Sequence, residues 1–318
     1  MTEQVVGRGQ TTDAAALGER PRLLSLTFRM LGTTADAEDA VQETYARWFR
    51  LTDAERTGIR SPQAWLTRVA SNICLDVLGS ARHRREQYVG EWLPEPLAAD
   101  ALSRHGHGHG HEHSNATNTD PLDYVTRNED VTMALLVVLE SLSPAERVAF
   151  VLHDVFALPF DEIAEIVGRT PQAARKLAST ARKNIAERRR REAPVERHTA
   201  VVKEFWTACG TGDVTELLRL LDPGAVLRVD GGGRVRAALR PILGADRVAR
   251  FVLGILSKPG NERASFETVN GRTAIVLRDG ADATNPVTGI AMFDVKDDLI
   301  ADVWFVRTPD KLGTFNRP

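Results

Sequence analysis

The segment from Ser143 to Arg191 constrains the fold of this chain more than any other part of the sequence. Gly168 can end one helix, Thr170 can cap the next, and Pro171 suits a first helical turn. The apolar run before Phe156 supplies a helix upstream of this pair. Short helices joined by a tight turn predict a helix-turn-helix, a fold that places its last helix in the major groove of DNA.

The predicted last helix has two chemically different faces. Five apolar residues recur at helical spacing on one face: Ala174, Leu177, Ala178, Ala181 and Ile185. The other face carries donors for bases and phosphates: Gln172, Arg175, Lys176, Ser179, Arg182 and Lys183. Residues 169–197 hold ten Lys/Arg and three Asp/Glu, whereas the whole chain has a net charge of −2. A local basic patch favours DNA binding, although a solvated basic face is the ordinary alternative.

Length and composition limit the remaining possibilities. A chain of 318 residues is long enough for two or three domains. Its two cysteines, Cys74 and Cys209, lie far apart in the sequence, which indicates a reducing compartment and no disulfide framework. No apolar run reaches membrane-spanning length, so we expect a cytoplasmic protein. Residues 1–15 are polar and small and predict a flexible tail.

Residues 16–90 predict a helical module. Leu23–Leu31 is apolar and stops at Gly32, and Thr34 can cap a second helix with acids in its first turn. Ser61-Pro62 starts a third helix, which ends in the strongly basic run Arg82–Arg85. A second helical module is expected over residues 130–194, and it contains the helix-turn-helix.

The intervening residues 91–129 predict a flexible linker. Two prolines in Trp92–Pro96 exclude a helix interior, and a low-complexity His-Gly tract follows at residues 105–113. Alternating histidines can bind zinc, nickel or copper. A glycine-rich tract holds no fixed ligand geometry, so we predict no metal site and no cofactor.

Residues 195–318 predict a domain of the α+β class. Val201–Cys209 and Val214–Leu221 have helical patterns. Short β-branched runs follow, punctuated by turns such as Asn270-Gly271 and Asp279-Gly280, and they predict a curved antiparallel sheet. Sixteen basic and fifteen acidic residues from Val201 onward nearly cancel, so a second DNA-binding module is not expected here.

The two helical modules resemble the conserved regions of an extracytoplasmic-function (ECF) sigma factor. The resemblance rests on four segments: Asp36–Trp48 (DAEDAVQETYARW), Pro62–Asp76 (PQAWLTRVASNICLD), Leu142–Arg147 (LSPAER) and Ile163–Gly168 (IAEIVG). Within that family the chain is similar to the SigJ-like subgroup, which carries a SnoaL-like C-terminal domain. Three motifs support the subgroup: Trp92–Pro96, Asp230–Arg234 and Thr308–Leu312, although the last usually begins with Asn.

The resemblance implies a multidomain fold, with an all-α region 2, an all-α region 4 and an α+β SnoaL-like cone. It also implies an RNA polymerase subunit that binds the β′ clamp and β flap of the core enzyme and directs initiation at −10 and −35 promoter elements. The −35 contacts would be the six polar residues of the last helix named above. The −10 contacts would be Arg68, Asn72, Asp76, Arg82, Arg84 and Arg85. Core-polymerase contacts would come from Asp36, Asp39, Gln42, Glu43, Arg47 and Trp48.

Two of these roles have competing structural readings. Trp48 lies on the inward apolar stripe and can equally belong to the core. Asp76 shares a helix face with Arg68 and can be a structural partner of Arg68 or of a nearby arginine.

The C-terminal domain is expected to regulate the sigma modules in cis, without a separate anti-sigma factor and with a possible small-molecule ligand. The predicted regulatory residues are those of the three motifs: Trp92, Pro94, Glu95, Pro96, Asp230, Gly231, Gly232, Gly233, Arg234, Pro309, Asp310, Lys311 and Leu312. The domain has no Tyr and no His beyond Val201, so Asp230 and Asp302 would lack donors for acid–base chemistry. We therefore predict that the protein is not an enzyme. The alternatives are a regulator that does not join polymerase and a DNA-binding protein fused to a SnoaL-like enzyme.

Overall fold

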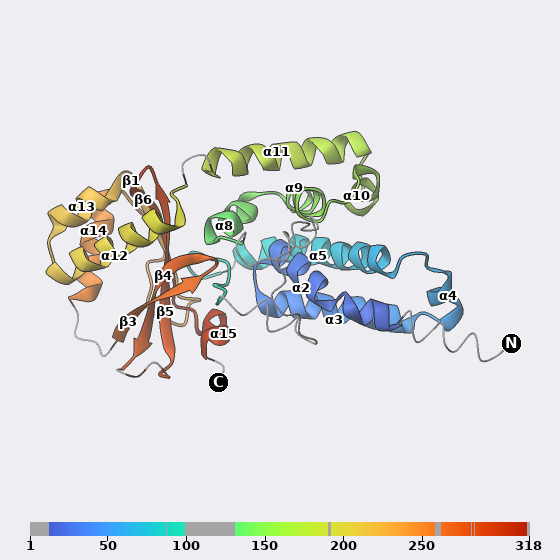
Figure 1. The fold of residues 1–318 in the computed structure, drawn as a ribbon, viewed down its shortest axis with the longest axis horizontal. Helices are drawn as coiled ribbons and strands as arrows, with labels where there is room; N and C mark the ends of the chain where they lie inside the picture. Colours follow the sequence, from blue (N-terminus) through green and yellow to red (C-terminus); the bar gives the residue numbers. More distant parts are fainter. Residues whose placement is uncertain are drawn as a thin grey trace, which may run out of the picture. The chain divides into compact units, whose positions relative to one another are not determined.

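The computed structural model describes residues 13–86, 88–98, 131–189, 192–257, 262–280, 282 and 284–316 (Figure 1). The chain forms two compact units. The first comprises Met1–His83, Leu102–Arg127 and Val138–Asn184. The second comprises Arg84–Ala101, Asn128–Val137 and Ile185–Pro318. None of the described helices is both long and apolar enough to cross a membrane.

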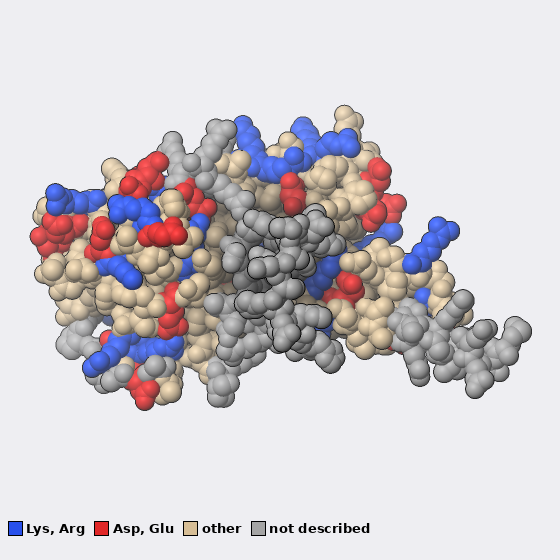
Figure 2. All heavy atoms as spheres, in the orientation of Figure 1, with Lys and Arg blue, Asp and Glu red and all other residues tan. Residues whose placement is uncertain are grey.

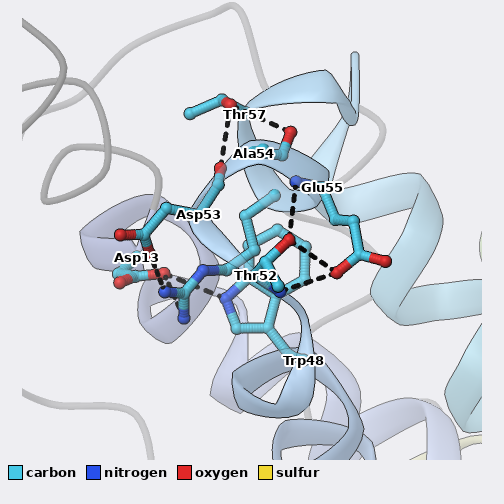
Figure 3. A network of polar contacts seen from close by, with 8 residues as sticks. Asp13, Trp48, Thr52, Asp53, Ala54, Glu55 and Thr57 are labelled. Carbon is cyan, nitrogen blue, oxygen red and sulfur yellow. Dashed lines mark hydrogen bonds and ion pairs between the residues drawn. The ribbon is translucent and has the colours of Figure 1, made fainter.

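The predicted region 2 forms four helices: α2 (Arg20–Leu31), α3 (Thr34–Arg50), α4 (Asp53–Gly58) and α5 (Pro62–Glu86). All four begin in the first unit, and the last residues of α5 belong to the second. Gly32 ends α2 with a φ of 81°. The cap of α3 is Thr33, which accepts a hydrogen bond from Asp36 N at 3.2 Å, so the prediction of Thr34 was wrong by one residue. The short helix α4 was not predicted. It is fixed by a capping box in which Thr52 and Glu55 satisfy each other's backbone N–H groups (Figure 3).

The predicted helix-turn-helix is confirmed. Its helices are α8 (Met133–Ser141), α9 (Pro144–Phe150), the π-helix η2 (Val151–Val155), α10 (Phe160–Val167) and α11 (Pro171–Arg189). Gly168 ends α10 with a φ of 62°, and the Thr170 hydroxyl accepts a hydrogen bond from Ala173 N at 3.2 Å. The local capping signals therefore form where the sequence places them.

The core of the first unit joins helices from both helical segments. Leu23 to Leu31 of α2 are all buried, so this helix is covered on every side. The guanidinium of Arg147 on α9 is also buried, and it donates to Met30 O at 2.8 Å and to Glu140 Oε1 at 2.7 Å. Burial lowers the pKa of Arg147 to about 10. Region 2 and the helix-turn-helix thus share one core.

The second unit is an α+β domain, as expected. Its elements are α12 (Val195–Thr211), α13 (Val214–Leu220), β1 (Leu221–Asp230), β2 (Ile242–Leu243), α14 (Ala245–Leu256), β3 (Glu262–Val269), β4 (Arg272–Asp279), β5 (Val287–Lys296), β6 (Leu299–Val306), η3 (Pro309–Leu312) and α15 (Gly313–Asn316). The sheet order is β2-β1-β6-β5-β4-β3. Strands β1 and β6 pair in parallel, so the expectation of a wholly antiparallel sheet was wrong. The excursion through α14, which the sequence reading missed, lets β6 return in the direction of β1.

Both faces of the sheet are buried. Phe293, Val303 and Phe305 belong to one hydrophobic cluster with residues of α12 and α14. Their strand neighbours Met292 and Trp304 point to the opposite face and are also buried. The sheet therefore buries side chains on both faces, and α12 and α14 cover one of them.

Candidate DNA-binding and linker-anchoring sites

Helix α11 presents the two faces that the sequence predicts. Ala174, Ala178 and Ala181 are fully buried. All six predicted −35 residues are exposed: Gln172, Arg175, Lys176, Ser179, Arg182 and Lys183. Basic side chains follow this helix on the face seen in Figure 2. The arrangement suits a recognition helix, because its donors are free of the core.

Two of the exposed arginines have partners within the helix-turn-helix. The Arg175 guanidinium lies 5.0 Å from the centre of the Phe160 ring. Arg182 Nε lies 3.0 Å from Asp154 Oδ1. Burial raises the pKa of Asp154, while Arg182 opposes that shift. These contacts orient the two arginines along α11 and leave the ion pair open to exchange for a phosphate.

The predicted −10 residues lie on α5. Arg68 and Asp76 are exposed and Asn72 is half-buried. Arg68 Nη1 lies 2.8 Å from Glu165 Oε2 of α10, so the structure gives Arg68 a partner in region 4 rather than Asp76. Arg82, Arg84 and Arg85 continue the backbone of α5, but their side chains lie outside the described residues.

The predicted polymerase-binding residues all lie on α3 and differ in their exposure. Asp39, Gln42 and Arg47 are exposed, whereas Asp36 and Glu43 are half-buried. Glu43 accepts from Arg47 at 2.8 Å, and that hydrogen bond lowers the pKa of the Glu43 carboxyl. These five side chains can meet a partner.

Trp48 does not offer a docking surface. Its side chain is 0% exposed, and its indole N–H donates to Asp13 at 3.1 Å (Figure 3). Its ring packs edge-on against Trp65. The prediction that Trp48 contacts the polymerase is therefore wrong, because Trp48 lies on the inward apolar stripe and its side chain belongs to the core. The neighbouring Phe49 is 47% exposed and is the aromatic side chain that α3 presents to solvent, which the sequence reading missed.

Asp230, at the end of β1, is the centre of a buried polar cluster. Its carboxylate accepts from Tyr88 Oη at 2.6 Å, Leu93 N at 2.9 Å, Thr308 Oγ1 at 2.6 Å and Lys311 Nζ at 2.6 Å. Burial by itself raises the pKa of this carboxyl, but the Lys311 charge and these hydrogen bonds outweigh burial and hold the pKa below its ordinary value. The backbone N–H of Gly232 also donates to this carboxylate, at 3.1 Å. Asp230 is therefore an anion fixed by five donors.

Lys311 completes the cluster from η3. Its ammonium donates to Leu93 O at 2.5 Å and lies 4.2 Å from the centre of the Trp92 ring. Both backbone groups of Leu93 are thus held by one ion pair. The three motifs predicted to be regulatory, Trp92–Pro96, Asp230–Arg234 and Thr308–Leu312, meet at this point.

The glycines of the loop are required by close packing. A Cβ on Gly231 would lie 2.4 Å from Val235 O, and one on Gly232 would lie 2.6 Å from Thr308 Cγ2. Gly232 and Gly233 also have positive φ angles of 62° and 70°. The adjacent Arg234–Asp310 pair, at 2.8 Å, is 65% exposed on both sides and contributes little.

Asn270 forms a second anchor that the sequence reading treated only as a turn. With Gly271 it makes the β3–β4 hairpin, and both residues have positive φ, at 49° and 69°. Its side chain accepts from Leu97 N at 3.1 Å and donates to Val131 O at 3.1 Å, and its own N–H donates to Leu97 O at 2.9 Å. Residues 91–98 are therefore held in place, and the prediction that they belong to a flexible linker was wrong.

Two further buried carboxylates of the sheet are paired. Asp302 lies 2.8 Å from Arg228 Nη1, and Asp294 lies 2.7 Å from Lys296 Nζ. Within the described residues, no group of three or more His, Cys, Asp and Glu side chains could hold a metal ion. The His-Gly tract lies outside those residues.

Comparison with known proteins decides the family. Residues 18–85 match the model of Sigma-70 region 2, and residues 132–185 match that of Sigma-70, region 4. The ECF RNA polymerase sigma factor SigJ of Mycobacterium tuberculosis is 39% identical over 302 residues, which cover 92% of this chain and 90% of SigJ. The chain belongs to the ECF sigma factor family. Like its relatives it directs transcription initiation and is not an enzyme, so the two competing functions are set aside.

The similarity of this ECF sigma factor to its relatives includes the C-terminal domain. The probable ECF sigma factor SigI of M. tuberculosis is 35% identical over 301 residues, covering 94% of each chain. The crystal structure of M. tuberculosis SigJ superimposes with a TM-score of 0.68 at 36% identity and covers 93% of this chain and 96% of SigJ. The α+β domain is thus part of the shared architecture, in the position expected for a SnoaL-like domain.

Proposed function

We propose that this ECF sigma factor is restrained in cis by its C-terminal domain, which clamps the linker between regions 2 and 4. In the released form α3 binds the polymerase core at the β′ clamp, with the β flap as the second contact. Helix α5 then recognises the −10 element, and α11 reads the −35 element. No separate anti-sigma factor is required for this restraint.

The observation that carries the proposal is the position of Asn270 between the two ends of the linker. One side-chain amide bonds to Leu97 and to Val131, which are 34 residues apart in the sequence. An extended chain of that length would reach about 110 Å, since each residue adds about 3.3 Å. Because Asn270 bonds both Leu97 and Val131, the two ends of the linker stay close together. The linker therefore cannot extend to let regions 2 and 4 separate.

The clamp has a useful strength for a switch. A neutral hydrogen bond contributes about 1 kcal/mol net and one to a charged group about 1.5–3 kcal/mol, so release of the linker costs several kcal/mol. A bias of about 3 kcal/mol corresponds to a population ratio of about 100-fold. Binding of polymerase core to the released form could supply such a bias through differential affinity.

The test is run-off transcription with purified core polymerase on a promoter selected from random duplexes by the holoenzyme. Asn270→Gly keeps the positive φ of the hairpin and removes both side-chain bonds. We expect at least fivefold more transcript at limiting sigma factor, together with tighter core binding. Asp298→Gly, at the comparable positive-φ turn between β5 and β6, is the matched control and should leave transcription unchanged.

Unchanged transcription by a folded Asn270→Gly protein would contradict restraint through the linker. Reduced transcription would contradict restraint by the C-terminal domain, because the contacts of Asn270 with the linker would then support activity. Asn270→Asp separates the two bonds, since a carboxylate still accepts from Leu97 N but cannot donate to Val131 O. An effect of Asn270→Asp close to that of Asn270→Gly would assign the restraint to the Val131 end.

A further inference from the structure

The turn between α9 and α10 has an irregular backbone. It begins as the π-helix η2, in which Phe156 N donates to Val151 O at 3.1 Å, across five residues rather than four. Ala157 follows with a φ of 55°, in the left-handed region that residues other than glycine seldom adopt. Such π turns are frequent at functional sites, and a strained residue persists where the surrounding structure holds it. The contacts of this turn therefore deserve a functional reading.

The turn is anchored in the core of the first unit. Val151 and Leu152 are fully buried, and Phe156 is buried with them. The guanidinium of Arg22 on α2 lies 5.2 Å from the centre of the Phe156 ring. Side chains that leave the turn toward α11 therefore start from a rigid support.

Two consecutive residues of the turn reach the arginines of the recognition helix. Asp154 carries the ion pair with Arg182, at 3.0 Å. His153 reaches the other arginine through a ring, because its imidazole centre lies 3.9 Å from that of Phe160, the first residue of α10. The Arg175 guanidinium lies 5.0 Å from the centre of the same Phe160 ring. The turn thus supports both arginines, one directly and one through Phe160.

The imidazole of His153 has a fixed orientation. Its Nδ1 lies 3.0 Å from Leu158 O, and because a carbonyl oxygen only accepts, Nδ1 carries the hydrogen. The imidazole on which the Phe160 ring packs is therefore tied to the backbone of the turn.

An arginine that reads a base edge gains from such a support. Its long side chain has many rotamers when it is free, and fixing one of them on binding costs conformational entropy. A cation–π contact at an exposed site favours one rotamer about two- to fivefold, which preorganises the guanidinium without withholding it from DNA. The exposed Arg175 on its ring meets this description.

We propose that His153 and Phe160 are positioning residues for base recognition by Arg175. The inference rests on the proposed reading of the −35 element by α11, and it names the residues behind that helix that set its specificity. A stack that served only packing would change stability and affect all promoters alike. A positioning stack changes discrimination at the one base pair that Arg175 reads.

The test is binding of reconstituted holoenzyme to duplex promoters with a randomised −35 element, with bound and free DNA sequenced. Arg175→Ala identifies the base pair that Arg175 reads. We expect Phe160→Leu to lose about two- to fivefold of the discrimination at that base pair and to keep the other preferences, whereas Phe160→Tyr, which keeps the ring, matches the wild type. Ala157→Gly, at the exposed positive-φ position of the same turn, is the matched control and should keep every preference.

His153 is tested at the same base pair. His153→Leu and His153→Phe both lose the hydrogen bond to Leu158 O, but only the second keeps a ring. Only His153→Leu should therefore lose discrimination, and by no more than Phe160→Leu. Because His153 acts through Phe160, adding His153→Leu to Phe160→Leu should cause no further loss, and an additive loss would overturn this route.

The outcomes separate the positioning role from the function on which it rests. Unchanged preferences in Arg175→Ala would contradict base reading by Arg175, and the positioning role with it. Relaxed discrimination in Arg175→Ala alone would leave the reading of the −35 element by α11 standing and overturn the positioning role. So would a uniform loss of affinity in folded Phe160→Leu. If Phe160→Leu lacks a cooperative thermal transition, the two His153 variants decide.

Discussion

Lys311 Nζ lies 2.6 Å from the Asp230 carboxylate, and the two side chains are 8% and 0% exposed. Removing two such charges from water costs several kcal/mol per ion, so the pair is not a large net source of stability. Its effect is geometric, because each partner also bonds one backbone group of Leu93. The ion pair therefore fixes the linker at a defined position on the C-terminal domain.

Loss of one charge should destabilise the second unit strongly. We expect Lys311→Met to lower its free energy of unfolding by about 3–5 kcal/mol, because a buried carboxylate is left without its cation. Arg234→Met, which removes the exposed pair with Asp310, should cost less than about 1 kcal/mol. Urea denaturation followed by tryptophan fluorescence measures both. Equal effects of the two variants would show that Asp230 is not an anion in the folded protein.

Acid should release the linker, and the sign follows from the lowered pKa of Asp230. A carboxyl with a depressed folded-state pKa stabilises fully above its unfolded value of about 3.9, and the stability is lost as pH falls through the folded value. We expect the difference in unfolding free energy between wild type and Asp230→Asn to be constant from pH 5 to 8 and to shrink below about pH 4. A difference that instead changes near neutral pH would contradict the ionised cluster.

The parts of the fold that could be predicted depend on local signals. Gly168, Thr170 and Pro171 act within one turn of each other, so the helix-turn-helix could be predicted from its capping residues. The inward stripe of α3 likewise indicated the core as an alternative position for Trp48, and its assignment to a partner was wrong. The Asn270-Gly271 hairpin was recognised as a turn for the same reason.

What could not be predicted depends on contacts between distant residues. The partner of the Asn270 side chain, Leu97, lies 173 residues away, and Tyr88 lies 142 residues from Asp230. No periodicity in the sequence specifies such pairs, and the motif resemblance indicated only that the three segments act together. The parallel pairing of β1 with β6 was missed for the same reason, because it depends on the path of the chain between them.

The ion pair between Arg68 and Glu165 should occupy a side chain that is predicted to contact the −10 element, while contributing little stability. Its side chains are 56% and 61% exposed, so Glu165→Ala should change the unfolding free energy by less than about 1 kcal/mol. We expect Arg68→Ala to reduce open-complex formation at least tenfold, whereas Glu165→Ala should maintain or increase it. Permanganate footprinting of the −10 region with reconstituted holoenzyme distinguishes them. A parallel loss in both variants would indicate that the pair serves only packing.

The exposed basic residues of α11 should contribute unequally to −35 recognition. Lys176→Ala should weaken holoenzyme binding to the selected promoter uniformly across −35 variants if it contacts phosphate, and should reduce the salt slope by about 1. Arg175, oriented on the Phe160 ring, is the better candidate for a base edge, and Arg175→Ala should cost about 1–3 kcal/mol and relax specificity at one position. Lys203→Ala on α12 is the control for a general loss of positive charge. If all three variants lowered affinity alike and kept specificity, α11 would be only an electrostatic surface and not the reader of the −35 element.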